Sequence, residues 1–160
     1  MSLSVGDIAP DFELVGTAPE PFRLRDQLGE RHIVIAFYEL AFNDDCTDEM
    51  LAFQELLPQF EEAGAGVVGV SLDPKGVLDS FAGSNGLAFT LLSDTFNHEV
   101  CSRYGAWRTD RGFASSTGGI ARRITYVIDK QGLVRGVIED LQDVRQHADE
   151  ALRVVKRLAS

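Results

Sequence analysis

The chain has 160 residues, of which 15 are Lys or Arg and 25 are Asp or Glu, so its formal charge is −10. This length fits a single domain over residues 1–160, and the 44% of apolar residues is enough for a core, which excludes wholesale disorder. The excess of acids disfavours nucleic acid and membranes as partners, because phosphate backbones and anionic lipids repel it. The longest apolar run, around Ile33–Tyr38, is too short to cross a bilayer, and the start of the chain has no secretion signal. We therefore expect a cytoplasmic protein.

The first part of the chain predicts a hairpin, a strand and a long helix. Asp11–Val15 and Phe22–Leu24 alternate apolar and polar residues around a Pro-containing turn, which indicates an N-terminal β-hairpin. His32–Tyr38 is rich in β-branched and aromatic residues, as in a central strand buried on both faces. From about Asp45 to Ala63, apolar residues recur at three- and four-residue spacing and predict a helix.

The middle of the chain predicts a second strand–helix pair and a third strand. Val67–Leu72 is a buried-type strand, and Asp73 followed by Pro74 predicts the capped start of a helix that runs through about Ser84. Phe89–Leu92 then predicts a short strand.

The last third completes an α/β pattern. Ser93–Thr95 predicts the cap of a helix that ends at Gly105. A loop, a hairpin and a closing helix follow at Arg108–Gly119, at Arg122–Asp129 with Leu133–Ile138, and at Asp143–Leu158. With right-handed crossovers, this order predicts an α/β, thioredoxin-like fold: a central mixed sheet with helices on both faces and an N-terminal β-hairpin.

Cys46 falls in the first turn of the predicted long helix, where unpaired backbone N–H groups and the helix dipole favour a thiolate. A cysteine with an ordinary pKa of about 8.5 is only a few per cent ionised at neutral pH. A helix N-terminus together with a nearby arginine can bring that pKa below 7. The alternative is a buried, unreactive cysteine, since Cys is among the most buried residue types.

The residues around Cys46 carry a family resemblance. Phe37–Met50 reads Phe-Tyr-Glu-Leu-Ala-Phe-Asn-Asp-Asp-Cys-Thr-Asp-Glu-Met, and it resembles the peroxidatic segment of peroxiredoxins, the AhpC/TSA superfamily. The pattern looks most like the one-cysteine AhpE-like branch, with the bacterioferritin-comigratory type as the next relative. The likeness extends over nearly the whole chain, through Gly6–Phe12, Leu91–Asp94, Tyr104-Gly105, Arg123–Asp129 and Gly132.

The resemblance implies a thiol-dependent peroxidase. A Cys46 thiolate would attack hydrogen peroxide or an organic hydroperoxide, become a sulfenic acid and be recycled by an external thiol, either a thioredoxin-like protein or a low-molecular-weight compound. Arg123 matches the arginine that stabilises the developing charge, so we expect it beside the sulfur. Glu49 matches the acid that orients the arginine, although it also reads as an ordinary acid of a first helical turn. The resemblance implies no cofactor or metal and allows a homodimer.

The sequence departs from the family motif at two positions. The motif is Pro-x-x-x-Thr-x-x-Cys, and this chain has Glu39 in place of the proline and Asn43 in place of the threonine. Asn43 keeps a donor amide for the substrate, whereas Glu39 introduces a charge. Asp44 and Asp45 add two more acids, which capping of the helix explains. These departures leave open an alternative function, a non-catalytic or redox-sensing thioredoxin-like domain.

Cys101 has two interpretations. It flanks an apolar stripe of Phe96, Val100 and Tyr104, which favours a small buried side chain. A resolving role would require Cα atoms within about 7 Å of each other at Cys46 and Cys101. A metal site shared with His98 is disfavoured because no further ligand pair is visible.

Overall fold

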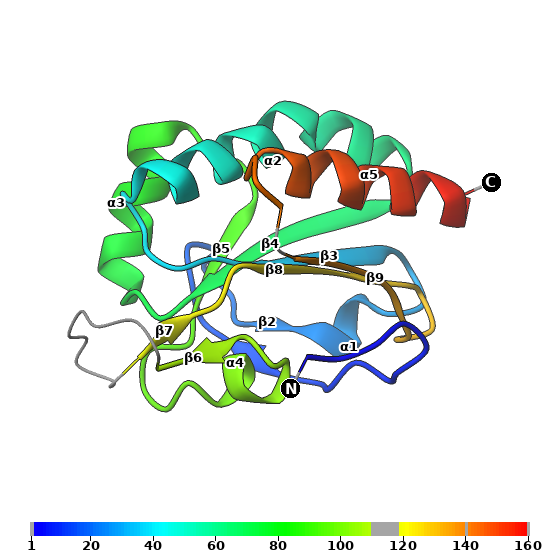
Figure 1. Cartoon of the computed structure of the whole chain (residues 1–160), viewed down its shortest axis with the longest axis horizontal. Coiled ribbons are helices and arrows are strands. Elements are labelled where there is room, and N and C mark those ends of the chain that lie inside the picture. Colours follow the sequence, from blue (N-terminus) through cyan, green and yellow to red (C-terminus); the bar gives the residue numbers. More distant parts are fainter. Residues whose placement is uncertain (1, 110–118, 140, 160) are drawn as a thin grey trace.

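A five-stranded mixed sheet forms the middle of the computed structural model, which describes residues 2–109, 119–139 and 141–159. The strands lie in the order β5-β4-β3-β8-β9 (Figure 1). Their bounds are β3 His32–Phe37, β4 Ala65–Ser71, β5 Thr90–Ser93, β8 Ile124–Ile128 and β9 Val134–Glu139. β3, β4 and β5 are parallel, and β8 is antiparallel to both of its neighbours. The predicted mixed sheet is confirmed.

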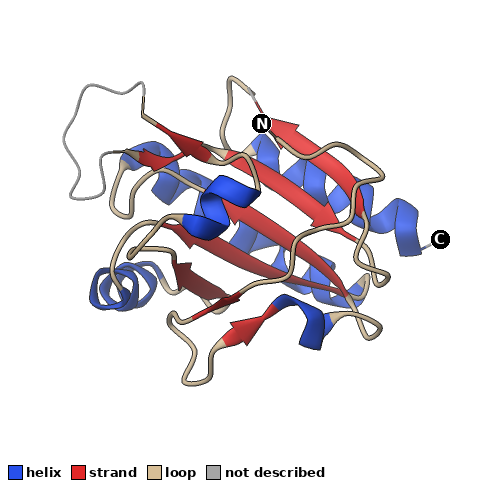
Figure 2. Cartoon of the chain, turned by 90° about the horizontal axis from the view of Figure 1, so that it is seen from below, coloured by secondary structure: helices blue, strands red, loops and turns tan. Residues whose placement is uncertain are grey.

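Helices cover both faces of this sheet, as predicted. One face carries the longer helices, α2 (Asp44–Glu62), α3 (Lys75–Asn85) and α5 (Gln146–Ala159). The other face carries short elements, which lie in front of the sheet in Figure 2. They are the helices α1 (Leu24–Gln27) and α4 (Glu99–Arg103), the predicted hairpin of β1 (Glu13–Leu14) with β2 (Phe22–Arg23), and the pair β6 (Trp107–Arg108) with β7 (Ile120–Ala121).

The central strand β3 divides the core into two halves. All six of its residues are buried, as its apolar sequence predicts. Because strand side chains alternate between faces, Ile33 and Ile35 join one core cluster, and Val34 joins the other. Cys46 belongs to the cluster beneath α2 and α5, whereas Cys101 belongs to the cluster beneath α4. The two thiols therefore lie on opposite faces of the sheet.

The helix predicted from Ser93–Thr95 to Gly105 is shorter than expected. It begins only at Glu99, and Phe96 is 95% exposed instead of contributing to an apolar stripe. Asp94 still caps the helix, but from a distance, because its carboxylate accepts a hydrogen bond from the Cys101 backbone N–H at 2.7 Å. Residues between the acid and the helix form turns, with His98 in the left-handed region at φ 45°.

Asp73 also differs from its prediction. The α3 helix is preceded by Pro74 and has no side-chain cap. The Asp73 carboxylate instead accepts hydrogen bonds from the Ala41 backbone N–H at 2.8 Å and from Ser71 Oγ at 2.7 Å. It thereby ties the loop that precedes Cys46 to the end of β4.

The remaining elements follow the predicted order. The hairpin of β8 and β9 is confirmed, with a register shift next to Val127 and Ile128. Most of the predicted loop Arg108–Gly119 lies outside the described residues. In the described part of the chain, no helix has both the length and the apolar character needed to cross a membrane.

Candidate active site

Cys46 is the third residue of α2, at the point where the β3–α2 loop becomes helical. Asn43 is the N-cap of this helix, and its side-chain oxygen accepts a hydrogen bond from the Cys46 backbone N–H at 3.2 Å. The cap satisfies one of the backbone donors that a helix start leaves unpaired. Asp44 and Asp45 are exposed acids of the first turn, and neither is the capping residue.

Arg123 lies beside the Cys46 sulfur, as expected. It directly precedes β8, which pairs with β3 in a register that sets Ile124 opposite Phe37. Continuing that register by one residue brings Arg123 to the end of β3, where the loop toward Cys46 begins. Arg123 Nη2 is 3.5 Å from Cys46 Sγ. The Leu40 backbone N–H also donates to this sulfur, so two donors converge on it.

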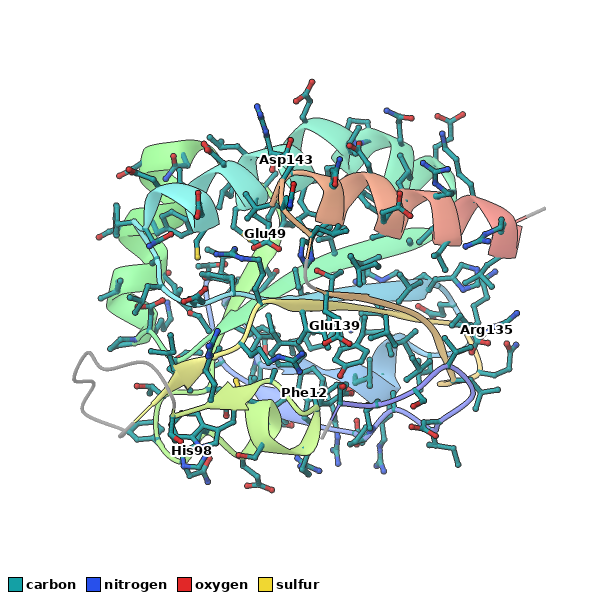
Figure 3. All side chains as sticks on the ribbon, viewed as in Figure 1. Phe12, Glu49, His98, Arg135, Glu139 and Asp143 are labelled. Atoms are coloured by element: carbon teal, nitrogen blue, oxygen red, sulfur yellow. The ribbon has the colours of Figure 1, made fainter. Side chains whose placement is uncertain are left out.

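Glu49 is buried and contacts Arg123, so it is not simply an exposed acid of the first helical turn. It lies one turn after Cys46 on the inner face of α2, between the helices and the sheet (Figure 3). Glu49 Oε1 is 2.7 Å from Arg123 Nη1. Burial raises the pKa of the Glu49 carboxyl to about 8, and the Arg123 guanidinium opposes that increase.

Glu39 also contacts Arg123, and sequence reasoning missed this contact. Glu39 Oε1 is 3.5 Å from Arg123 Nη2, and the two side chains are 18% and 14% exposed. The residue that stands in place of the family's proline is thus one of three groups around the same guanidinium. The one sequence signal for this contact was the residue itself, because the family motif has an uncharged proline where this chain has the acid Glu39.

His147, to which the sequence assigned no role, extends the cluster toward α5. Its Nδ1 is 3.6 Å from Glu49 Oε2 and 3.0 Å from the Thr125 hydroxyl, and the ring is fully buried. A cavity of about 140 Å³ lies against His147 and Arg123. No local motif marks this histidine, because packing of α5 on α2 and β8 creates its contacts.

The Cys46 thiol is fully buried. Burial raises its pKa, and the nearby Arg123 guanidinium and the Leu40 N–H lower it without fully compensating. Removal from water thus outweighs the two donors, so this arrangement does not give the lowered thiol pKa that a helix N-terminus and an arginine can produce. The expectation of a sulfur held beside Arg123 is confirmed in the geometry.

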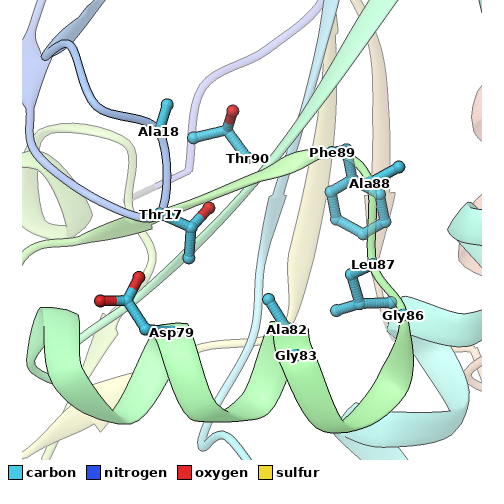
Figure 4. A pocket seen from close by; sticks show the side chains of 10 residues that line it. All are labelled: Thr17, Ala18, Asp79, Ala82, Gly83, Gly86, Leu87, Ala88, Phe89 and Thr90. Carbon is cyan, nitrogen blue, oxygen red and sulfur yellow. The ribbon is translucent and has the colours of Figure 1, made fainter.

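Elsewhere in the described part of the chain, neither the larger hollow nor any group suited to a metal offers comparable chemistry. A larger hollow of about 500 Å³ lies between α3 and the chain after β1 (Figure 4), and Asp79 is its only charged lining residue. Neither thiol nor Arg123 reaches it. The residues that the structure describes include no cluster of three His, Cys, Asp or Glu suited to a metal ion.

The fold and the site define a class of protein, the thiol oxidoreductases. Its features here are a thioredoxin-like sheet, a cysteine at the start of the long helix α2 and an arginine beside the sulfur. The comparisons specify the class. The model of the AhpC/TSA family matches residues 5–137. Peroxiredoxin Bcp of Escherichia coli K12 is 34% identical over 145 residues, which are 91% of each chain. Alkyl hydroperoxide reductase E of Mycobacterium tuberculosis is 32% identical over 134 residues, 83% of each chain.

A solved structure agrees with these relatives. The crystal structure of peroxidoxin BcpB from Mycobacterium tuberculosis has a TM-score of 0.87 and 32% identity, and the match covers 98% of each chain. The chain belongs to the AhpC/TSA family and is a peroxiredoxin, a thiol-dependent peroxidase. The resemblance and the fold predicted from the sequence are confirmed.

Proposed function

We propose that Cys46 is the nucleophile of this peroxidase and that Arg123 is its electrostatic stabiliser. The Cys46 thiolate attacks one oxygen of hydrogen peroxide or an organic hydroperoxide, so that a sulfur–oxygen bond forms and the O–O bond breaks. The departing oxygen leaves as water or an alcohol after it takes a proton, and the sulfur is oxidised to a sulfenic acid. The Arg123 guanidinium stabilises the negative charge of the thiolate and of the departing oxygen.

Glu49 and Asn43 support these two residues. The hydrogen bond that Arg123 Nη1 donates to Glu49 Oε1 orients the guanidinium toward the sulfur. Asn43 fixes the start of α2 through its side-chain oxygen, and its amide nitrogen remains as a donor for a bound peroxide. The observation that carries the proposal is the 3.5 Å contact between Arg123 Nη2 and Cys46 Sγ.

An external thiol completes the cycle. It attacks the sulfenic acid, forms a mixed disulfide and releases water; a second thiol then frees Cys46. Cys101 does not suit this step, because it is buried across the sheet from Cys46 and its pKa is raised well above the ordinary value by burial. We propose a thioredoxin-like protein or a low-molecular-weight thiol as the reductant. The cytoplasmic location, the homodimer and the single-domain organisation stay predictions.

The test is to oxidise the reduced protein with hydrogen peroxide and to trap the sulfenic acid with dimedone. Peptide mass spectrometry should locate the adduct on Cys46 at one equivalent of peroxide. Cys46→Ser should abolish both peroxide consumption and the adduct. Cys101→Ala is the matched control, and it should consume peroxide at the rate of the parent protein.

A Cys46 thiol that stays reduced in millimolar peroxide would contradict the proposal and favour the non-catalytic alternative. A Cys101→Ala variant that forms the sulfenic acid but cannot be recycled by any external thiol would contradict the reductant part alone.

A further inference from the structure

The Arg123 cluster holds one cation among three acidic groups. Arg123 contacts Cys46, Glu49 and Glu39, at 3.5, 2.7 and 3.5 Å. Since the same nitrogen, Nη2, contacts both the sulfur and Glu39, these two groups are separated by at most twice that distance. Once the thiol ionises, the single positive charge of the guanidinium is already shared between the thiolate and Glu39.

Only the outer part of this cluster meets solvent. Cys46 and Glu49 have no exposed surface, whereas the side chains of Glu39 and Arg123 are 18% and 14% exposed. Within the cluster, the Glu39 carboxylate and the guanidinium are therefore the groups that a hydroperoxide can meet from solvent. At this depth solvent screens charges less than it does at an open surface.

From this geometry we infer that Glu39 determines substrate specificity by selecting uncharged hydroperoxides over those that carry an anionic group near the O–O bond. The inference rests on the proposed role of Cys46. An anionic substrate would have to compete with Glu39 for the positive charge of Arg123. The Glu39 carboxylate would also repel it directly. A neutral hydroperoxide incurs neither penalty and can accept a hydrogen bond from the guanidinium.

Two more cations, Arg108 and Arg122, line the small cavity beside Arg123. Arg122, the adjacent cation, is paired with Glu139. Asp44 and Asp45 lie exposed in the first turn of α2 and add repulsion. Their exposure means that water and salt screen them more strongly than Glu39.

The experiment uses two organic hydroperoxides of the same carbon skeleton, one ending in a carboxylate and one in an uncharged carboxamide. The rate constant for oxidation of Cys46 is measured with each in a single turnover. The ratio of the two rate constants cancels any change in the thiolate fraction or in the position of Arg123 that affects both substrates. Glu39→Gln should raise the carboxylate-to-carboxamide ratio on the order of tenfold.

Two further variants make the result specific. Glu39→Asp keeps the charge and should keep most of the discrimination. Asp44→Asn removes an equal charge from the same region without touching Arg123, and it should change the ratio less than about twofold. If the ratio is unchanged in Glu39→Gln, or moves as far in Asp44→Asn, the inference is overturned.

The proposed function has a separate point of failure in the same experiment. If the parent protein does not oxidise Cys46 with the carboxamide substrate, the role of Cys46 fails. If it does, and only the ratio fails to respond, then Cys46 stands and the role of Glu39 alone is rejected.

Discussion

Cys46 is held between two opposing effects. Complete burial raises the pKa of its thiol, and the guanidinium of Arg123 at 3.5 Å lowers it. Arg123 in turn contacts Glu39 and Glu49, and it shares its charge with whichever of them is ionised. The reactivity of the thiol therefore depends on how strongly the Arg123 charge still stabilises the sulfur in the presence of the neighbouring carboxyl groups.

Replacing Arg123 should reveal that dependence. We expect Arg123→Gln to lower the rate constant for Cys46 oxidation on the order of a hundredfold, because one directed donor is worth that much at a developing oxyanion. The pH profile of Cys46 alkylation should shift to higher pH, since the remaining environment raises the thiol pKa further. Arg123→Lys keeps the positive charge, but it should restore only part of the rate, because an ammonium group lacks the planar, bidentate donor geometry of the guanidinium. An unchanged alkylation profile in Arg123→Gln would rule out this account.

The β3–α2 junction is the element that presents the cysteine. Asn43 closes the helix start, and Phe42 has a left-handed backbone at φ 67°. Asp73, from the neighbouring β4–α3 connection, holds the Ala41 N–H at 2.8 Å. The shape of the loop before Cys46 therefore depends on the hydrogen bond that Ala41 donates to Asp73 in the β4–α3 connection.

Asp73→Ala should loosen this junction. The change leaves the Ala41 N–H and the Ser71 hydroxyl without their acceptor, so we expect the free energy of unfolding to fall by about 1–3 kcal/mol. The rate of Cys46 oxidation should fall with it, as the Leu40 and Arg123 donors lose alignment. Urea denaturation and single-turnover oxidation are the measurements. Asp79→Ala, which removes an exposed pair with Lys75, is the control and should cost less than about 0.5 kcal/mol.

On the scale of the whole molecule, Glu49 joins three elements that are distant in sequence. It lies on α2, pairs with Arg123 at the start of β8 and faces His147 on α5. The Glu49 carboxyl is buried between the long helices and the sheet, so its protonation is coupled to folding.

The pH dependence of stability should report Glu49. Its pKa is about 8 in the folded protein and 4.5 in its ordinary state, so the unfolded chain releases this proton first as pH rises. The stabilisation is complete below pH 4.5 and is lost as pH rises through about 8.

We therefore expect the free energy of unfolding from urea titrations to fall between pH 5 and pH 8 by a few kcal/mol more in the parent protein than in Glu49→Gln. Groups such as His32, whose pKa burial lowers, act in both proteins and cancel in the difference. Parallel curves for the two proteins would contradict the raised pKa of Glu49.

The sequence by itself determined the order of the main elements (though not α1 or the β6–β7 pair), the central position of β3 and the placement of Cys46 in the first turn of a helix. Periodicity, turn residues and capping residues act over a few positions, so they can be read from the chain directly. The family motif added Arg123 and Glu49 as neighbours of the sulfur, although they lie 74 positions apart.

Only the tertiary structure decided how the charges are shared. Sheet register sets Arg123 beside the loop that holds Glu39, and the packing of α5 brings His147 to Glu49. The same structure places Cys101 across the sheet and leaves Asp94 to cap a helix that starts later than expected. Such contacts depend on burial and on long-range packing, and neither quantity is encoded in the spacing of residues along one segment.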